Sequence, residues 1–203
     1  MRFSKRASEH SSPQAAATNK KTGNRRAAFL DRDGVINVDH GYVHCPEDFE
    51  FIEGVFAACK HLQECGYLLV VITNQSGIAR GIFSAAQFKR LTEWMVGRFR
   101  EHGVEITAVY HCPHYPEPGP SRAADCACRK PAPGMLTQAI RELDIDPAAS
   151  IMIGDRETDM RAAAAAGVGH KILVRSGERI SPEAEKSADQ VWNSLKDAIK
   201  ALP

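Results

Sequence analysis

The sequence predicts an α/β domain of Rossmann-like, three-layer architecture, in which a mostly parallel sheet lies between two layers of helices. Two observations carry this prediction: short apolar runs alternate with amphipathic segments, and polar residues suited to chemistry follow the apolar runs. The 203 residues suffice for one domain with a substantial core, and 43% hydrophobic and 25% charged residues are ordinary for a globular protein. No apolar run approaches the roughly 18 residues of a membrane span, and no secretory signal is recognisable.

The first 26 residues differ in composition from the rest of the chain. They hold seven of the 26 Lys and Arg residues, one acidic residue and no apolar periodicity. Residues 27–203 therefore hold 19 basic and 24 acidic residues, a net charge of −5. We expect residues 1–26 to form a disordered basic tail and residues 27–203 to form the single domain. A body of this charge is not expected to bind nucleic acid in general.

The predicted elements alternate regularly. Strands are expected at residues 27–30, 67–73, 106–111, 150–154, 171–174 and 188–192, and helices at 55–65, 84–102, 133–143, 158–166 and from about 194. Ser84 is expected to be an N-cap that forms a capping box with Gln87. Alternating strands and helices form right-handed βαβ units, so a ligand site is expected at the carboxyl ends of the strands.

Two carboxylates, Asp31 and Asp33, follow the first predicted strand and precede Gly34. In a tight turn they repel each other, so a cation or a proton must resolve the repulsion. A Mg²⁺ ion bound by Asp31 would do so, with Asp33 turned elsewhere and carrying a proton. The alternative is an ordinary surface turn, in which Asp and Gly are common.

Further polar residues lie where other predicted strands end or helices begin. Thr73 and Asn74 end the second strand, Lys130 precedes a helix, and Asp155 and Asp159 lie four residues apart at the opening of another helix. Singly, each has a structural alternative: a strand cap, a solvated lysine, or a first-turn acid favoured by the helix dipole. Their occurrence together, in this order and at strand ends, favours one catalytic site.

A second cluster supplies three thiols and one imidazole, from Cys112, His114, Cys126 and Cys128. A Cys₃His set suits tetrahedral Zn²⁺, and four protein ligands leave no open position, so the zinc would be structural. It would pin the loop between the two halves of the cluster, which is rich in Pro and Gly and could bury no core of its own. His111 is the competing ligand, and four unligated side chains are the other alternative.

The chain resembles the haloacid dehalogenase-like phosphatase superfamily, and within it the D,D-heptose 1,7-bisphosphate phosphatases, in five segments: DRDGVINVDHGYV, TNQSGIARG, CPHYP, CACRKPAPGM and GDRETDM. Histidinol-phosphate phosphatases are similar. The resemblance covers about residues 27–195. It implies a magnesium-dependent phosphomonoester hydrolase that removes a phosphate, the C7 phosphate by expectation, from a heptose bisphosphate in lipopolysaccharide precursor synthesis.

The resemblance also implies residue roles. Asp31 would attack phosphorus and become an aspartyl-phosphate, while Asp33 would protonate the leaving oxygen and later accept a proton from water. Mg²⁺ would be held by the Asp31 and Asp155 carboxylates and the Asp33 carbonyl oxygen. Thr73 and Lys130 would bind the transferring phosphoryl oxygens.

Substrate recognition is expected to come from loops, because the gaps between the motifs leave no room for a separate cap domain. The resemblance suggests sugar contacts from seven residues: Asp39, His40, Gly41, Tyr42, Asn74, Gln75 and Ser76. Arg129 and Arg156 are candidates for the second phosphate, since a guanidinium matches phosphate oxygens. A solvated position at a helix start is the alternative for Arg156. Asp159 would orient Lys130 or a metal-bound water.

Three functions stay open from sequence. A heptose-bisphosphate phosphatase is favoured over a phosphatase of another molecule, such as histidinol phosphate or a nucleic-acid 3′-phosphate. The third is a non-enzymatic, zinc-stabilised scaffold, against which the intact catalytic set argues. We expect a cytoplasmic monomer with a small phosphorylated sugar as its substrate and with no nucleic-acid or membrane partner.

Overall fold

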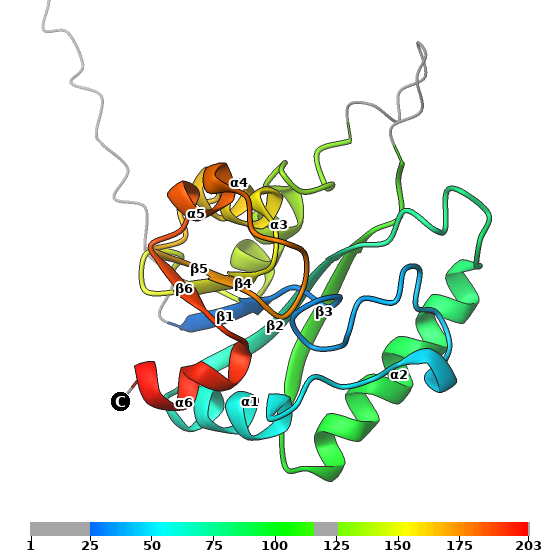
Figure 1. Cartoon of the computed structure of the whole chain (residues 1–203), viewed down its shortest axis with the longest axis horizontal. Coiled ribbons are helices and arrows are strands. Elements are labelled where there is room, and N and C mark those ends of the chain that lie inside the picture. Colours follow the sequence, from blue (N-terminus) through cyan, green and yellow to red (C-terminus); the bar gives the residue numbers. More distant parts are fainter. Residues whose placement is uncertain (1–24, 116–125, 203) are drawn as a thin grey trace, which may run out of the picture.

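The computed structural model describes residues 25–115 and 126–202, and in this part of the chain the six strands form one parallel sheet (Figure 1). The strands are β1 (Arg26–Leu30), β2 (Tyr67–Asn74), β3 (Ile106–Cys112), β4 (Ile151–Gly154), β5 (His170–Val174) and β6 (Gln190–Trp192). Their order is β3-β2-β1-β4-β5-β6, and every pairing is parallel. The predicted fold class is confirmed. Strand β1 begins one residue earlier than predicted, and most of the predicted tail lies outside the described residues.

The helices form two layers. They are α1 (Val55–Glu64), α2 (Ala85–Glu101), α3 (Gly134–Glu142), α4 (Glu157–Ala165), α5 (Pro182–Ser187) and α6 (Ala198–Ala201), with short 3-10 turns η1 (Pro46–Asp48) and η3 (Leu195–Asp197). Helices α1, α2 and α6 lie on one face of the sheet, and α3, α4 and α5 lie on the other (Figure 1). Helix α5 and the turn η1 were not predicted, because six and three residues are too few to show an apolar period.

Alternation along the strands explains the two layers. In β1, Ala28 and Leu30 belong to the core under α1 and α2, whereas Ala27 and Phe29 belong to the core under α3 and α4. The predicted capping box of α2 is present: Ser84 Oγ accepts the Gln87 N–H at 3.2 Å, and Gln87 Oε1 accepts the Ser84 N–H at 2.9 Å. These local features place helices and strands as the sequence predicts.

The sheet order positions the site. The chain moves outward from β1 to β3 through α1 and α2, then returns to β4 beside β1 and continues on the other side. The carboxyl ends of β1 and β4 therefore flank a topological switch point, where α/β sheets bind their ligands. Among the described residues, the connections 31–54 and 75–84 hold no separate cap domain. No helix in the described ranges is both long and apolar enough to cross a membrane.

Candidate active site

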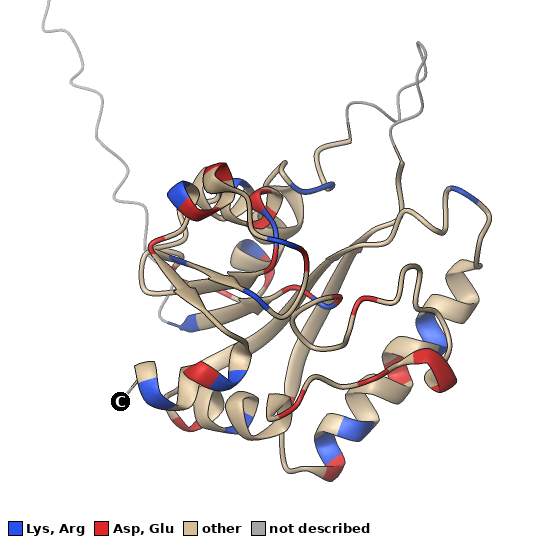
Figure 2. Cartoon of the chain, viewed as in Figure 1, with Lys and Arg blue, Asp and Glu red and all other residues tan. Residues whose placement is uncertain are grey.

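A pocket of about 620 Å³ opens at the carboxyl ends of β1, β2 and β4. Figure 2 shows acidic and basic positions meeting there, near the middle of the view. The pocket is lined by most of the predicted site residues: Asp31, Asp33, Asp39, Gly41, Tyr42, Thr73, Asn74, Gln75, Ser76, Arg129, Lys130, Asp155 and Arg156. Residues from five separate stretches of sequence are thus brought together at one edge of the sheet.

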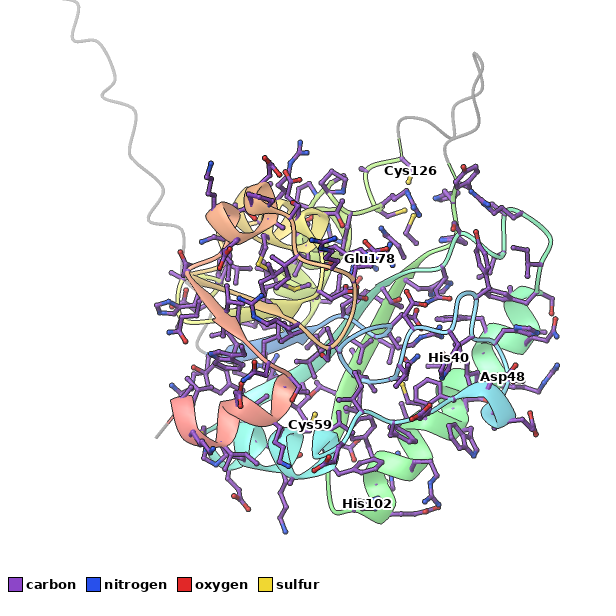
Figure 3. The ribbon with its side chains drawn as sticks, in the orientation of Figure 1. His40, Asp48, Cys59, His102, Cys126 and Glu178 are labelled. Carbon is purple, nitrogen blue, oxygen red and sulfur yellow. The ribbon has the colours of Figure 1, made fainter. Side chains whose placement is uncertain are left out.

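His40 is the predicted sugar contact that the structure places elsewhere. Gly41 (φ 75°) and Tyr42 (φ 53°) turn the chain in the left-handed region, so the neighbours of His40 line the pocket while His40 does not. Its Nε2 lies 3.0 Å from Glu50 Oε2, and it lines an adjacent cavity with Asp48 (Figure 3). In this arrangement His40 faces an acidic surface and not the pocket.

Lys130 lies at the centre of the buried charge cluster. Its Nζ is 2.9 Å from Asp31 Oδ2 and 2.6 Å from Asp159 Oδ1, and it donates to the Ile72 carbonyl oxygen at 2.8 Å. Burial lowers the pKa of Lys130, but the two carboxylates outweigh it and the pKa is raised. Asn74 holds the backbone of Lys130 in place: its side-chain oxygen accepts the Lys130 N–H, and its side-chain nitrogen donates to the Lys130 carbonyl oxygen, both at 3.1 Å. Asn74 therefore positions Lys130, in addition to its predicted place among the sugar contacts.

Asp33 is held by donors on three sides. Arg32 Nη2 donates to both carboxylate oxygens at 2.9 and 3.0 Å, and Asn37 Nδ2 and Gln75 Nε2 each donate at 3.0 Å. Gln75 Nε2 also donates to Thr73 Oγ1 at 2.8 Å, which links the ends of β1 and β2. The Asp33 oxygens accept these hydrogen bonds in part because Arg32 turns its guanidinium back onto the neighbouring side chain. Arg32 was not among the predicted site residues.

Three buried carboxylates, Asp31, Asp155 and Asp159, have oxygens within 4.8 Å of one another. Burial raises the pKa of Asp31 to about 8; Lys130 opposes the shift, and repulsion from Asp159 and Asp155 adds to it. Burial, followed by repulsion from Asp159, raises the pKa of Asp155 to about 6. One ammonium group among three carboxylates leaves an excess of negative charge that a divalent cation would neutralise.

The surroundings of Asp155 fit such a cation. Its Oδ2 accepts the Glu178 N–H at 3.0 Å, whereas its buried Oδ1 has no hydrogen-bond partner among the described residues. A Cβ atom at Gly34 would lie 2.5 Å from Asp155 Oδ2, and one at Gly177 would lie 2.1 Å from the same oxygen. Side chains at these two positions would therefore disrupt the Asp155 carboxylate. The oxygen donor set and the free Oδ1 suit Mg²⁺, a hard cation that prefers oxygen ligands.

The raised pKa values predict how stability depends on pH. In metal-free protein, the folded state binds more protons than the unfolded state, because the pKa values of Asp31 and Asp155 are raised on folding. The associated stability is fully present below the unfolded pKa values of 3.8 and is lost as pH rises from there through the folded values of about 6 and about 8. We expect the Tm of metal-free protein to fall over that range, and Mg²⁺ to raise Tm more at high pH. Asp155→Asn is expected to flatten the dependence. A metal-free Tm that rises with pH, as measured by calorimetry, would contradict the electrostatic interpretation.

Arg156, a predicted candidate for a phosphate contact, is paired with carboxylates in the structure. Its Nη2 lies 3.0 Å from Asp39 Oδ2 and 3.0 Å from Glu178 Oε1, and its Nε lies 3.8 Å from Asp155 Oδ2. The guanidinium is thus shared among three carboxylates from three segments. Because these carboxylates neutralise it, Arg156 is better suited to hold the loop at Asp39 to the loop at Glu178 than to bind an anion.

The predicted cysteine cluster is assembled. Cys112 Sγ lies 3.5 Å from Cys126 Sγ and 3.0 Å from Cys128 Sγ, and His114 Nδ1 lies 3.3 Å from Cys128 Sγ. The sulfur atoms gather beside the Cys126 label in Figure 3. Ligands around a tetrahedral zinc lie about 3.5–3.8 Å from one another, so the four side chains could hold that ion. The competing His111 instead packs its ring on Phe88, with centroids 4.3 Å apart.

The cluster adjoins the active-site loop. Arg129 Nη1 donates to the His114 carbonyl oxygen at 3.2 Å, and the Gly134 N–H donates to the Ala127 carbonyl oxygen at 2.8 Å. A Cβ atom at Gly134 would lie 2.1 Å from that same oxygen, so this close packing requires glycine. The cysteine cluster is therefore continuous with the turn that carries Arg129 and Lys130. The predicted loop tip lies outside the described residues.

Comparisons with known proteins agree with this geometry. A family model described as HAD-hydrolase-like matches residues 127–198. A Haemophilus ducreyi protein named D-glycero-beta-D-manno-heptose-1,7-bisphosphate 7-phosphatase is 56% identical over 176 residues, which cover 86% of this chain and 97% of the relative. A protein of the same name from Escherichia coli K12 is 55% identical over 177 residues, covering 87% and 93%.

A solved structure is also similar. It is the D,D-heptose 1,7-bisphosphate phosphatase from B. bronchiseptica, complexed with magnesium and phosphate. The TM-score is 0.75 at 32% sequence identity, and the match covers 87% of this chain and 97% of that chain.

The parallel sheet, the Asp31–Lys130–Asp155 cluster at its switch point and the family model together define a phosphatase of the haloacid dehalogenase-like class. The chain belongs to the family of D-glycero-beta-D-manno-heptose-1,7-bisphosphate 7-phosphatases, since it is more than half identical to members that it covers almost completely.

Proposed function

We propose that the protein removes the C7 phosphate of D-glycero-beta-D-manno-heptose 1,7-bisphosphate by way of a phosphoryl group carried on Asp31. The observation that carries the proposal is the buried carboxylate of Asp31, 2.9 Å from the Lys130 ammonium in a pocket shared with Asp155. The family supports the substrate. We place the reaction in the synthesis of ADP-heptose for lipopolysaccharide, in the cytoplasm.

The proposed chemistry has two displacements. In the first, an Asp31 carboxylate oxygen forms a bond to phosphorus, the bond from phosphorus to the sugar oxygen breaks, and that oxygen takes a proton from Asp33. In the second, a water oxygen forms a bond to phosphorus and gives a proton to Asp33, while the bond from phosphorus to the Asp31 oxygen breaks. Inorganic phosphate leaves, and the Asp31 carboxylate is restored. Because Arg32 and Gln75 hold Asp33 in the free protein, its carboxyl group must turn from them to reach the sugar oxygen.

Other side chains stabilise the transferring group. Lys130 Nζ and Thr73 Oγ1 line the pocket beside Asp31 and would bind phosphoryl oxygens, on which negative charge develops. Asp159 holds Lys130 by a contact of 2.6 Å. Mg²⁺ would be held by the carboxylates of Asp31 and Asp155 and the carbonyl oxygen of Asp33. There it would neutralise part of the negative charge of the phosphate.

The substrate assignment is tested by kcat/KM on three compounds. We expect the β-anomer of the heptose 1,7-bisphosphate to exceed histidinol phosphate and a 3′-phosphorylated oligonucleotide by on the order of 10²-fold or more, because only it suits both the reacting and the distal subsites. A preference for either of the other compounds would overturn the substrate but not the chemistry. No turnover of any phosphomonoester with Mg²⁺ present would favour the scaffold function.

We also propose that the Cys₃His cluster holds a structural Zn²⁺ that fixes the turn carrying Arg129 and Lys130. Replacing Cys128 by serine is expected to remove the zinc and lower kcat/KM by about 10- to 100-fold, because the ligand set and its neighbours would lose their positions. Elemental analysis and kinetics measure the two effects. Cys45→Ser, at a thiol outside the cluster, serves as the control. Zinc-free wild-type protein prepared without chelators would contradict the proposal.

A further inference from the structure

The described residues place four cationic side chains on the lining of the pocket: Arg129, Lys130, Arg156 and Arg179. Two of them are already neutralised. Lys130 pairs with Asp31 and Asp159, and Arg156 pairs with Asp39 and Glu178. A bisphosphate brings a second, non-reacting dianion into the pocket, and this group needs a cation that no carboxylate has neutralised.

Arg179 is such a cation. It is exposed, and its guanidinium makes no hydrogen bond or ion pair with another residue in the described ranges. Arg129 also lacks a carboxylate partner in these ranges, but one of its N–H groups already donates a hydrogen bond to the His114 carbonyl oxygen. An exposed arginine alone indicates little. Arg179 is distinguished because it lines the pocket with none of its N–H groups engaged in the described ranges, whereas Lys130 and Arg156 are ion-paired and Arg129 donates to a carbonyl oxygen.

The backbone at Arg179 is fixed relative to the reacting centre. The preceding residue, Glu178, donates its N–H to Asp155 Oδ2 at 3.0 Å and pairs its carboxylate with Arg156. Gly177 packs so closely on Asp155 that a Cβ atom would lie 2.1 Å from Oδ2. Glu178 is labelled near the centre of Figure 3. Arg179 therefore extends from a segment that contacts Asp155, a proposed metal ligand. Its backbone is held at a fixed place beside the reacting centre, from which its guanidinium can reach into the pocket.

We infer that Arg179 is a specificity-determining residue, whose guanidinium binds the phosphate group of the substrate that is not hydrolysed. The inference rests on the proposed function, since it requires a bisphosphate. A guanidinium presents several N–H donors in a planar fork that matches phosphate oxygens, so the contact would be lost in part even with lysine. Because this phosphate does not react, the contact contributes equally to the ground state and the transition state, and its loss raises KM without lowering kcat.

The test compares Arg179→Met, Arg179→Lys and the control Arg175→Met on two substrates. Arg175 pairs with Glu185 at 3.6 Å and does not line the pocket. For the heptose bisphosphate, Arg179→Met is expected to raise KM by about 10- to 100-fold at nearly constant kcat, with Arg179→Lys between it and wild type. For p-nitrophenyl phosphate, which has no second phosphate, kcat/KM is expected to stay within about twofold in all variants.

The outcomes separate the two proposals. If wild-type protein prefers the bisphosphate and Arg179→Met keeps that preference, the role of Arg179 is wrong while the proposed function stands. Equal losses on both substrates would mean that the side chain supports the loop and binds no distal phosphate, and would also overturn the inference. If wild-type protein shows no preference for the bisphosphate, the proposed function fails, and the inference fails with it.

Discussion

Purified Asp31→Asn protein is expected to keep its fold and to lose turnover by on the order of 10⁴-fold or more, because an amide cannot form the acyl phosphate. The substitution is nearly isosteric, and Lys130 keeps its contacts with Asp159 at 2.6 Å and the Ile72 carbonyl oxygen at 2.8 Å. Removing one of three neighbouring carboxyl groups also relieves electrostatic repulsion within the cluster of Asp31, Asp155 and Asp159. Steady-state kinetics and calorimetry measure the two effects.

The matched control for this substitution is Asp189→Asn. Asp189 Oδ2 forms an ion pair with Nζ of Lys171, a residue of strand β5, at 2.7 Å, and Asp189 does not line the pocket. Its replacement is expected to leave kcat within about twofold of the wild-type value. It should lower the free energy of unfolding by less than about 1 kcal/mol, which is the usual contribution of an ion pair near the surface. Turnover by Asp31→Asn close to that of this control would defeat the covalent role of Asp31.

Lys130→Met is expected to lower kcat by about 10²- to 10³-fold, the scale of losing a key electrostatic partner of the transition state. It should also lower the free energy of unfolding by roughly 3–5 kcal/mol near neutral pH, because the buried carboxyl groups of Asp31 and Asp159 would lose the ammonium group that both of them contact. Urea unfolding and steady-state kinetics report the two losses separately.

A second variant distinguishes catalysis from stability. In Lys130→Met combined with Asp159→Asn, one of the two stranded carboxylates is also removed, so much of the stability is expected to return while kcat stays low. Lys171→Met, at the ion pair on strand β5, is the control for removing a lysine. Recovery of normal kcat together with stability would show that Lys130 is structural only.

Local chemistry explains how much of the fold was predictable. Each long element carries its own signal: strand β2 is an unbroken aliphatic run from Leu68 to Ile72, and α2 begins at the Ser84–Gln87 capping box. Parallel pairing then follows from the alternation of strands and helices. The short helix α5 was missed although Ser181 caps it and Pro182 opens it, because these signals precede too few residues to form an apolar stripe.

The sequence predicted which residues form the site, but it did not predict which of them form ion pairs with one another. Asp31, Thr73, Lys130 and Asp155 could be found because the ends of parallel strands meet at one edge of a sheet. Which cations are neutralised depends on loop paths that no local pattern encodes. The carboxylates around Arg156 come from residues 39, 155 and 178, and the turn at Gly41 directs His40 away from the pocket.

Two residues gave weak signals in the sequence. Arg32 stands between the two motif aspartates, and an arginine in that place has a carboxylate within reach on either side. Arg179 follows a glycine-containing turn after β5, a strand whose carboxyl end lies at the same edge as the site. The predictions of a monomer, of a cytoplasmic location and of no nucleic-acid or membrane partner stay predictions from the sequence.

The stereochemical course at phosphorus tests the central claim most directly. A phosphorothioate analogue of the substrate, whose reacting group is made chiral with two oxygen isotopes, is hydrolysed in water labelled with the third, and the configuration of the released thiophosphate is determined. Transfer to Asp31 followed by transfer to water inverts phosphorus twice, so the account predicts overall retention. Overall inversion would mean that water attacks the substrate directly, and would contradict an aspartyl-phosphate on Asp31.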